Sequence, residues 1–315
     1  MKKVDAQTLN LPVMQSHTNV IQPTLLIFAW TATLLVSSLP SILPQELHVF
    51  EALPFLYLRA ALLLSFIALG FFWKPARLLR PYFVIFLILY LADALSNWVS
   101  ATYQWQQWFI GVQPAFTREM LSTQVLRLAV ACMIILSVWF IRPRWGMFLL
   151  SKGRLDATAE PVRWLGMDQP IRWTRFGLIL SVCITAGTLA FLILSSSRSS
   201  DLVSRIIPLL PMILVISAMN AFSEEVTYRA SLLAPLLTAL GKSQALLLTA
   251  ALFGLWHYYG IPYGVVGVIM AGGLGWLLGK SMLETKGIFW AWFIHFWQDV
   301  AIFAFIAAGS IVAGG

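Results

Sequence analysis

Residues 206–237 read IIPLLPMILVISAMNAFSEEVTYRASLLAPLL, an apolar run that two adjacent glutamates and an arginine interrupt. An ionised side chain at the centre of a bilayer costs about 2.5–3.5 kcal/mol on insertion scales, so it faces a protein interior or a water-filled cavity. Glu224, Glu225 and Arg229 are therefore candidates for a functional site within a membrane-embedded fold.

The composition of the whole chain indicates a polytopic membrane protein. Its 315 residues are 59% hydrophobic and only 11% charged, with a mean hydropathy of +0.81, whereas soluble domains carry about 25% charged residues. The net charge of +8 does not indicate nucleic-acid binding. The basic residues gather in short loops between apolar segments, as expected of cytoplasmic loops.

The number of apolar segments sets the expected fold. A helix that spans a bilayer needs about 20 apolar residues. We therefore expect an all-α fold, a polytopic transmembrane helix bundle of about nine membrane spans, with a short extra apolar piece at 231–240. The expected spans are 23–40, 53–73, 81–101, 122–141, 174–196, 205–227, 243–258, 262–279 and 287–310.

A polar segment divides the chain into two membrane parts. We expect a cytoplasmic N-terminal segment (1–22), N-terminal transmembrane helices of unknown role (23–150), a polar cytoplasmic connector (151–173) and a C-terminal transmembrane part (174–315). The loops on one side of the expected spans carry most of the lysines and arginines, which places the N-terminus in the cytoplasm.

Two further polar clusters lie in the apolar C-terminal third. Phe253 and His257 are four residues apart, as are His295 and Asp299, so each pair shares a helix face. Glu225 and Arg229 have the same spacing, which favours an ion pair. Neighbouring residues lie about 100° apart around a helix, so one glutamate can be structural and the other reactive.

These clusters together can support hydrolysis. A glutamate, two imidazoles and a second carboxyl group can polarise a water molecule and stabilise the oxyanion that forms when water attacks an amide. The same residues, Glu224, His257, His295 and Asp299, also suit a divalent metal. No HExxH zinc motif occurs, so the sequence requires no cofactor.

Other polar residues have simpler interpretations. His257 can belong to an interfacial aromatic belt. Asp93, in the third expected span, can form a structural ion pair with Arg59 or Arg127, since charges within membranes usually pair. The alternative for Asp93 is a substrate or proton path.

The motifs EExxxR, FxxxH and HxxxD, in this order on consecutive helices, resemble those of the CPBP family, which contains CAAX proteases and bacteriocin-processing enzymes. The family core would cover about 203–308. The resemblance implies an intramembrane endopeptidase, similar to type II CAAX prenyl proteases, of the bacterial cytoplasmic membrane. Its partners would be the lipid bilayer and a peptide or membrane-protein substrate, which can be lipidated.

The resemblance also implies roles for the site residues. Glu224 and His257 would activate water, His295 and Asp299 would stabilise the oxyanion, and Arg229 would hold the glutamate region in place. Asp299 stands where eukaryotic prenyl proteases have Asn, and an ionised carboxylate cannot donate to an oxyanion. A non-catalytic immunity or scaffold protein of the same fold, and a metal-dependent membrane hydrolase, are the alternatives.

The depth of the three clusters in the membrane restricts the fold. If 205–227 were one span, Glu224 would lie about 28 Å along it, too far from the histidines. We therefore expect residues 206–240 to form a single tilted or broken helix with Glu224 near its middle. Pro208, Pro211 and Pro235 allow such breaks.

Overall fold

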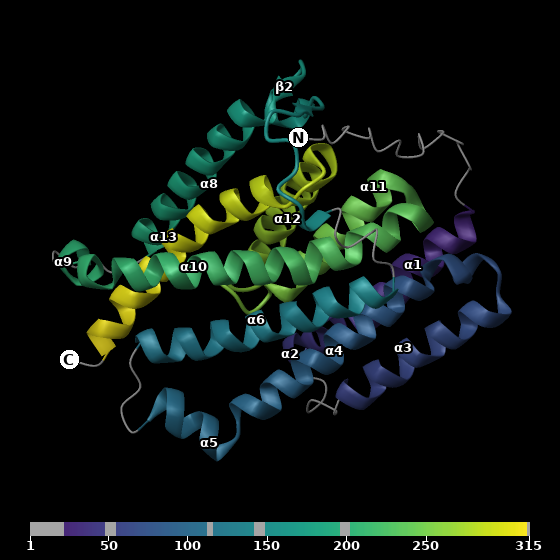
Figure 1. Ribbon diagram of the computed structural model, residues 1–315, viewed down its shortest axis with the longest axis horizontal. Coiled ribbons are helices and arrows are strands. Elements are labelled where there is room, and N and C mark those ends of the chain that lie inside the picture. The colour runs from purple at the N-terminus through teal and green to yellow at the C-terminus, as the bar shows by residue number, and fades with distance from the viewer. Residues whose placement is uncertain (1–21, 48–54, 112–115, 142–148, 196–201, 314–315) are drawn as a thin grey trace, which may run out of the picture.

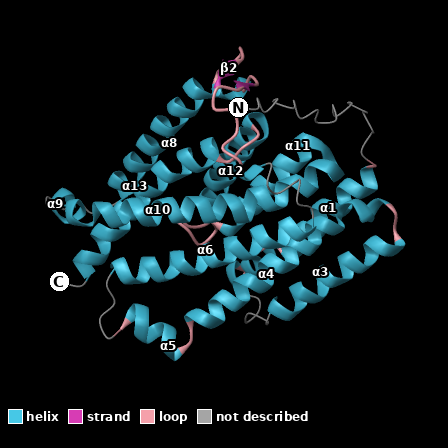
Figure 2. Cartoon of the chain, in the orientation of Figure 1, coloured by secondary structure: helices cyan, strands magenta, loops and turns pink. Residues whose placement is uncertain are grey.

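The computed structural model describes residues 22–47, 55–111, 116–141, 149–195 and 202–313. These residues form helices and a single two-stranded sheet (Figures 1 and 2). The expected N-terminal segment, 1–22, lies almost wholly outside the described residues. The helices are α1 (Pro23–Val36), α2 (Leu39–Glu46), α3 (Phe55–Phe72), α4 (Arg80–Ser100), α5 (Tyr103–Trp105), α6 (Phe116–Ile141), α8 (Trp173–Ser195), α9 (Leu202–Ile206), α10 (Leu210–Glu224), α11 (Ser231–Trp256), α12 (Val265–Thr285) and α13 (Phe289–Ala313).

The all-α, multi-pass membrane architecture is confirmed, but the count of nine spans is not. Six described helical runs are long and apolar enough to cross a bilayer. The number becomes seven if α1 and α2, which are bent by 58° at their junction, form one span. The runs are Pro75–Ser100, Phe116–Ile141, Trp173–Ser195, Leu202–Trp256, Val265–Thr285 and Phe289–Gly309.

The differences from nine have local causes. The expected first span breaks at Ser37, whose hydroxyl binds the carbonyl oxygen of Leu34, and Pro40 follows in the first turn of α2. Proline cannot donate a backbone hydrogen bond to the preceding turn. The apolar helix Tyr57–Phe72 is shorter than a full span. The expected spans 205–227 and 243–258 lie in the one run Leu202–Trp256.

The helix that carries the two glutamates is continuous, as expected. It passes from α10 through a π-helical turn at Glu225–Ala230, here called η5, into α11. The chain leaves helical geometry at Gly241, with φ 72° and ψ 175°, rather than at a proline. Glycine adopts positive φ without steric cost. Glu224 consequently lies near the middle of 206–240, at the depth of the two histidines.

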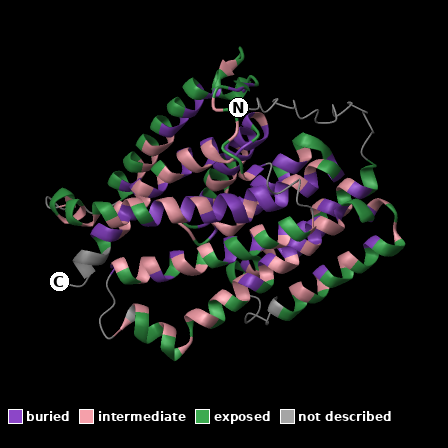
Figure 3. Ribbon diagram, viewed as in Figure 1, coloured by how far each residue is buried: buried purple, intermediate pink, exposed green. Residues whose placement is uncertain are grey.

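The buried residues gather along α10, α11 and α12, whereas α3 and α8 expose apolar side chains (Figure 3). Helix α10 packs against α6 on one side and α13 on another, and α11 packs against α12 (Figure 1). Exposed apolar faces on the outer helices fit a surrounding of lipid. The helix with the glutamates is therefore enclosed by protein.

The connector docks on the turn between α12 and α13. Its strands β1 (Thr158–Ala159) and β2 (Ile171–Arg172) pair antiparallel. Backbone bonds of 2.8 Å, from Arg154 N to Thr285 O, and 2.9 Å, from Ile288 N to Ser151 O, attach the connector to the turn. This docking holds the start of α13, and hence the helix that carries His295, against the connector.

We expect Gly153→Ala to destabilise this docking more than Gly166→Ala. Both glycines have positive φ, 76° and 72°, so both substitutions strain the backbone. A Cβ at Gly153 would also lie 2.7 Å from Thr285 O, whereas one at Gly166 would meet nothing within 4 Å. The shared strain costs about 1–3 kcal/mol. Thermal unfolding in detergent and protease cleavage within the connector measure the difference, and equal effects would contradict the tight contact.

Candidate active site

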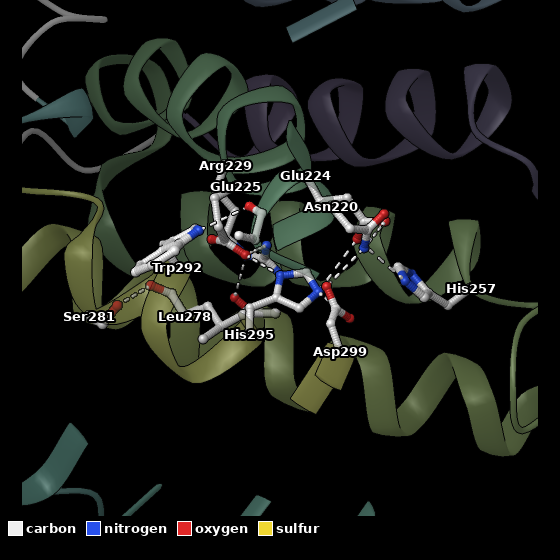
Figure 4. Close-up of polar contacts among 12 residues, drawn as sticks. Asn220, Glu224, Glu225, Arg229, His257, Leu278, Ser281, Trp292, His295 and Asp299 are labelled. Carbon is white, nitrogen blue, oxygen red and sulfur yellow. Dashed lines mark hydrogen bonds and ion pairs between the residues drawn. The ribbon is translucent and has the colours of Figure 1, made fainter. Parts of the chain in front are cut away.

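All six residues predicted from the sequence converge on one polar cluster inside the helix bundle (Figure 4). Helix α10 and the π-turn η5 supply the glutamates and Arg229, the end of α11 supplies His257, and α13 supplies His295 and Asp299. The spacing of four within each motif is the reason that two functional groups emerge from one helix face.

The two oxygens of Glu224 have different surroundings. Oε1 accepts hydrogen bonds from Arg127 Nη1 at 2.7 Å and from Asn220 Nδ2 at 3.3 Å. Oε2 is buried and accepts no hydrogen bond from any described residue. It lies 3.7 Å from Nε2 of His257 and 3.7 Å from Nε2 of His295. One oxygen is held by donors, and the other faces both imidazoles.

Glu225 is fully buried, and its carboxylate is bound by neighbouring side chains. Its Oε1 pairs with Arg229 Nη1 and accepts a bond from His295 Nδ1 at 2.7 Å. The Arg229 guanidinium lies 4.0 Å from the centre of the Phe253 ring. A cation over an aromatic face is stabilised by the ring quadrupole. Glu225 is therefore held by Arg229 and His295, and the division into one structural and one reactive glutamate stays a prediction.

Phe253 also positions His257. The two rings lie 4.2 Å apart, and His257 Nδ1 lies 2.8 Å from the backbone oxygen of Phe253. Since a carbonyl only accepts, Nδ1 carries the proton, and in the neutral form of the ring Nε2 is an acceptor that faces Glu224. The His257 side chain is 33% exposed, against 4% for His295. The cluster is therefore accessible on the His257 side.

Asp299 lies beside His295. Its Oδ1 is 3.6 Å from His295 Nε2, and its Oδ2 accepts a 3.0 Å hydrogen bond from Asn220 Nδ2. Asn220 stands one helical turn before Glu224 and so bridges the two carboxylates. At the position where eukaryotic prenyl proteases have Asn, this chain thus has the carboxylate of Asp299, which accepts a hydrogen bond from the Asn220 amide.

Two polar residues of the cluster are missing from the sequence-based prediction. Asn220 lies four residues before Glu224, and that spacing was a signal that could have found it. Arg127 was expected as a partner for Asp93 and instead binds Glu224 and Asn220. Within the described chain Asp93 forms no ion pair with either arginine, and Arg59 binds the Ser41 hydroxyl. The contact ion pair expected for Asp93 is therefore not formed, although Asp93 stays within electrostatic range of Arg127.

The glycine-rich segment 264–279 packs closely, as its small residues allow. Arg229 Nε donates to Gly275 O at 3.4 Å, and a Cβ at Gly275 would lie 3.1 Å from the Phe253 ring.

Among the described residues, no group of three or more His, Cys, Asp or Glu side chains has an arrangement that could hold a metal ion. The divalent metal at Glu224, His257, His295 and Asp299 stays a prediction.

Comparison with known families agrees with the placement of this cluster. Residues 206–301 match the family model described as type II CAAX prenyl endopeptidase, Rce1-like. This matched segment, similar to type II CAAX prenyl endopeptidases, is here called the Rce1-like domain. It begins just before α10 and ends within α13, close to the predicted core of 203–308. It contains the six predicted residues and Asn220, whereas Arg127 lies outside it.

No curated protein and no solved structure matches the chain. The family assignment therefore rests on the Rce1-like segment and on the motif residues within it. It supports a protease that is embedded in the membrane as a multi-pass protein.

Proposed function

We propose that the protein is an intramembrane endopeptidase in which Glu224 and His257 activate a water molecule that attacks a peptide bond. The observation that carries this proposal is the surroundings of Glu224 Oε2. That oxygen is buried, accepts no hydrogen bond from any described residue, and lies 3.7 Å from two imidazole nitrogens. A carboxylate oxygen and an imidazole acceptor on either side of a water can remove its proton during attack.

His295 is the proposed oxyanion stabiliser. Its Nδ1 donates to Glu225, so Nε2 can donate to an oxyanion only in the doubly protonated imidazolium. Stabilising the charge that develops in the transition state is usually the largest single contribution to such catalysis. Asp299 faces Nε2 and accepts from Asn220, which supports a role in orienting His295 rather than in donating to the oxyanion.

The proposed substrate is a peptide segment of a membrane-associated protein, which can be lipidated. The match to CAAX prenyl endopeptidases and the position of the cluster among apolar helices support this class. A substrate would approach from the His257 side, where the water-activating imidazole is 33% exposed. The proposed location is the bacterial cytoplasmic membrane, with the N-terminus in the cytoplasm.

Comparison of membrane proteomes tests the proposal. Cells that produce the wild type are expected to contain new protein termini that are absent from cells producing Glu224→Gln at the same membrane level. New termini in both would contradict the role of Glu224, whereas no new termini in either, relative to cells without the protein, would contradict an endopeptidase and support the non-catalytic immunity or scaffold role. Loss of the new termini on chelation, restored by one added metal, would support the metal-dependent hydrolase instead.

A further inference from the structure

Arg127 enters the active site from outside the Rce1-like domain. It lies near the middle of α6, and α6 packs against α10. Its Nη1 donates to Glu224 Oε1 at 2.7 Å and also donates to Asn220 Oδ1. The two acceptors are one helical turn apart, so a single guanidinium spans the face of α10 that carries the reactive carboxylate.

The contact with Glu224 acts on one oxygen only. Arginine stays charged at any working pH, and a charge-assisted hydrogen bond to a carboxylate is about twice as strong as a neutral one. Because Oε1 is held in this way, the rotation of the carboxyl group is fixed. Oε2 is then the oxygen that faces Nε2 of His257 and of His295.

The contact with Asn220 has a second effect. An arginine can only donate, so it binds the amide oxygen of Asn220 and leaves the amide NH2 group to face the carboxylates. Asn220 Nδ2 then donates to Glu224 Oε1 at 3.3 Å and to Asp299 Oδ2 at 3.0 Å. Reversal of the amide would place its oxygen against two carboxylates. Arg127 thus orients Asp299 as well as Glu224.

We infer that Arg127 is a positioning residue for the hydrolysis, supplied by the N-terminal helices that the family match does not cover. The inference rests on the proposed function. The Arg127 side chain is 47% exposed, whereas that of Arg229 is 1% exposed. Substitution at Arg127 consequently removes little buried packing, and its effect on catalysis can be separated from an effect on folding.

The test compares purified wild type, Arg127→Gln and Arg127→Lys on a substrate found from the membrane proteomes. We expect Arg127→Gln to lower kcat by about 100-fold, the effect of a misplaced catalytic group, with KM unchanged because no substrate contact is lost. Arg127→Lys keeps the charge without the planar donor group, and its kcat is expected to lie between those of the wild type and Arg127→Gln. Arg59→Gln is the matched control, since Arg59 binds Ser41 in the N-terminal helices, and we expect its kcat to be that of the wild type.

A wild-type kcat in Arg127→Gln, or a raised KM with unchanged kcat, would overturn the inference. If Arg127→Gln does not accumulate in membranes, Arg127→Lys decides: a fall in kcat of about tenfold supports the positioning role, and a wild-type kcat overturns it. Glu224→Gln is measured alongside. Cleavage that persists in Glu224→Gln defeats the proposed function itself, whereas Glu224-dependent cleavage that ignores Arg127 defeats only this inference.

Discussion

Glu224→Gln is expected to lower kcat by about 10²–10⁴-fold, the range that a positioned general base contributes. Glutamine has nearly the same shape, but an amide next to the histidines cannot take a proton from water. The Arg127 bond to the other oxygen of the side chain can persist, so the fold and the membrane level are expected to stay normal. Single-turnover kinetics on purified protein in lipid nanodiscs measure the effect on the chemical step.

Glu284→Gln is the matched control for this substitution. Glu284 lies near the end of α12 with a side chain 5% exposed, close to the 9% of Glu224, and it pairs with Lys280. It also accepts a 2.9 Å bond from Trp173 Nε1, so it lies at the connector and not at the active site. We expect Glu284→Gln to reduce stability and to leave kcat unchanged. Full activity in Glu224→Gln would show that Glu224 is not the general base.

Arg229→Met is expected to cost about 3–5 kcal/mol of stability, as breaking a buried ion pair does. Both side chains of the Glu225–Arg229 pair are almost completely buried. Without the guanidinium, the Glu225 carboxylate keeps only the His295 bond, and the Phe253 ring loses the cation above it. Equilibrium unfolding in mixed detergent micelles gives the free-energy difference.

Two comparisons show whether the loss comes from an unpaired buried charge. The double variant Glu225→Gln with Arg229→Met removes both charges, so its cost is expected to be less than the sum of the two single costs. Asp156→Asn breaks the exposed pair with Arg172, whose atoms are 3.5 Å apart, and is expected to cost at most about 1 kcal/mol. Strict additivity of the two buried substitutions would contradict direct coupling between Glu225 and Arg229.

The sequence predicts the site better than it predicts the arrangement of the spans. Charged residues in apolar runs are rare enough to be noticed, and a spacing of four places each pair on one face, so the cluster follows from local rules. The bend at Ser37 and the π-helical continuation of α10 into α11 depend on local backbone geometry that hydropathy does not report. The count of nine is therefore not confirmed, although the all-α membrane class is confirmed.

The pairing of Arg127 illustrates the remaining difficulty. An arginine within an apolar span is expected to pair with an acid, and Asp93 was the acid within the same group of expected spans. The actual partner, Glu224, is 97 residues away along the chain. Only the packing of α6 on α10 decides between the two acids. Contacts between distant helices of this kind have no signature in the spacing of one sequence.

The π-helical turn at Glu225–Ala230 has a consequence for how related sequences are aligned. Such a turn holds one more residue than an α-helical turn over the same stretch of axis. Each residue turns an α-helix by about 100°, so the faces before and after the wide turn are out of phase with a continuous α-helical pattern. A relative that is α-helical throughout this stretch therefore aligns in phase with the downstream half only if a one-residue gap is placed inside the turn; an ungapped alignment would rotate the downstream core-facing positions by about 100°.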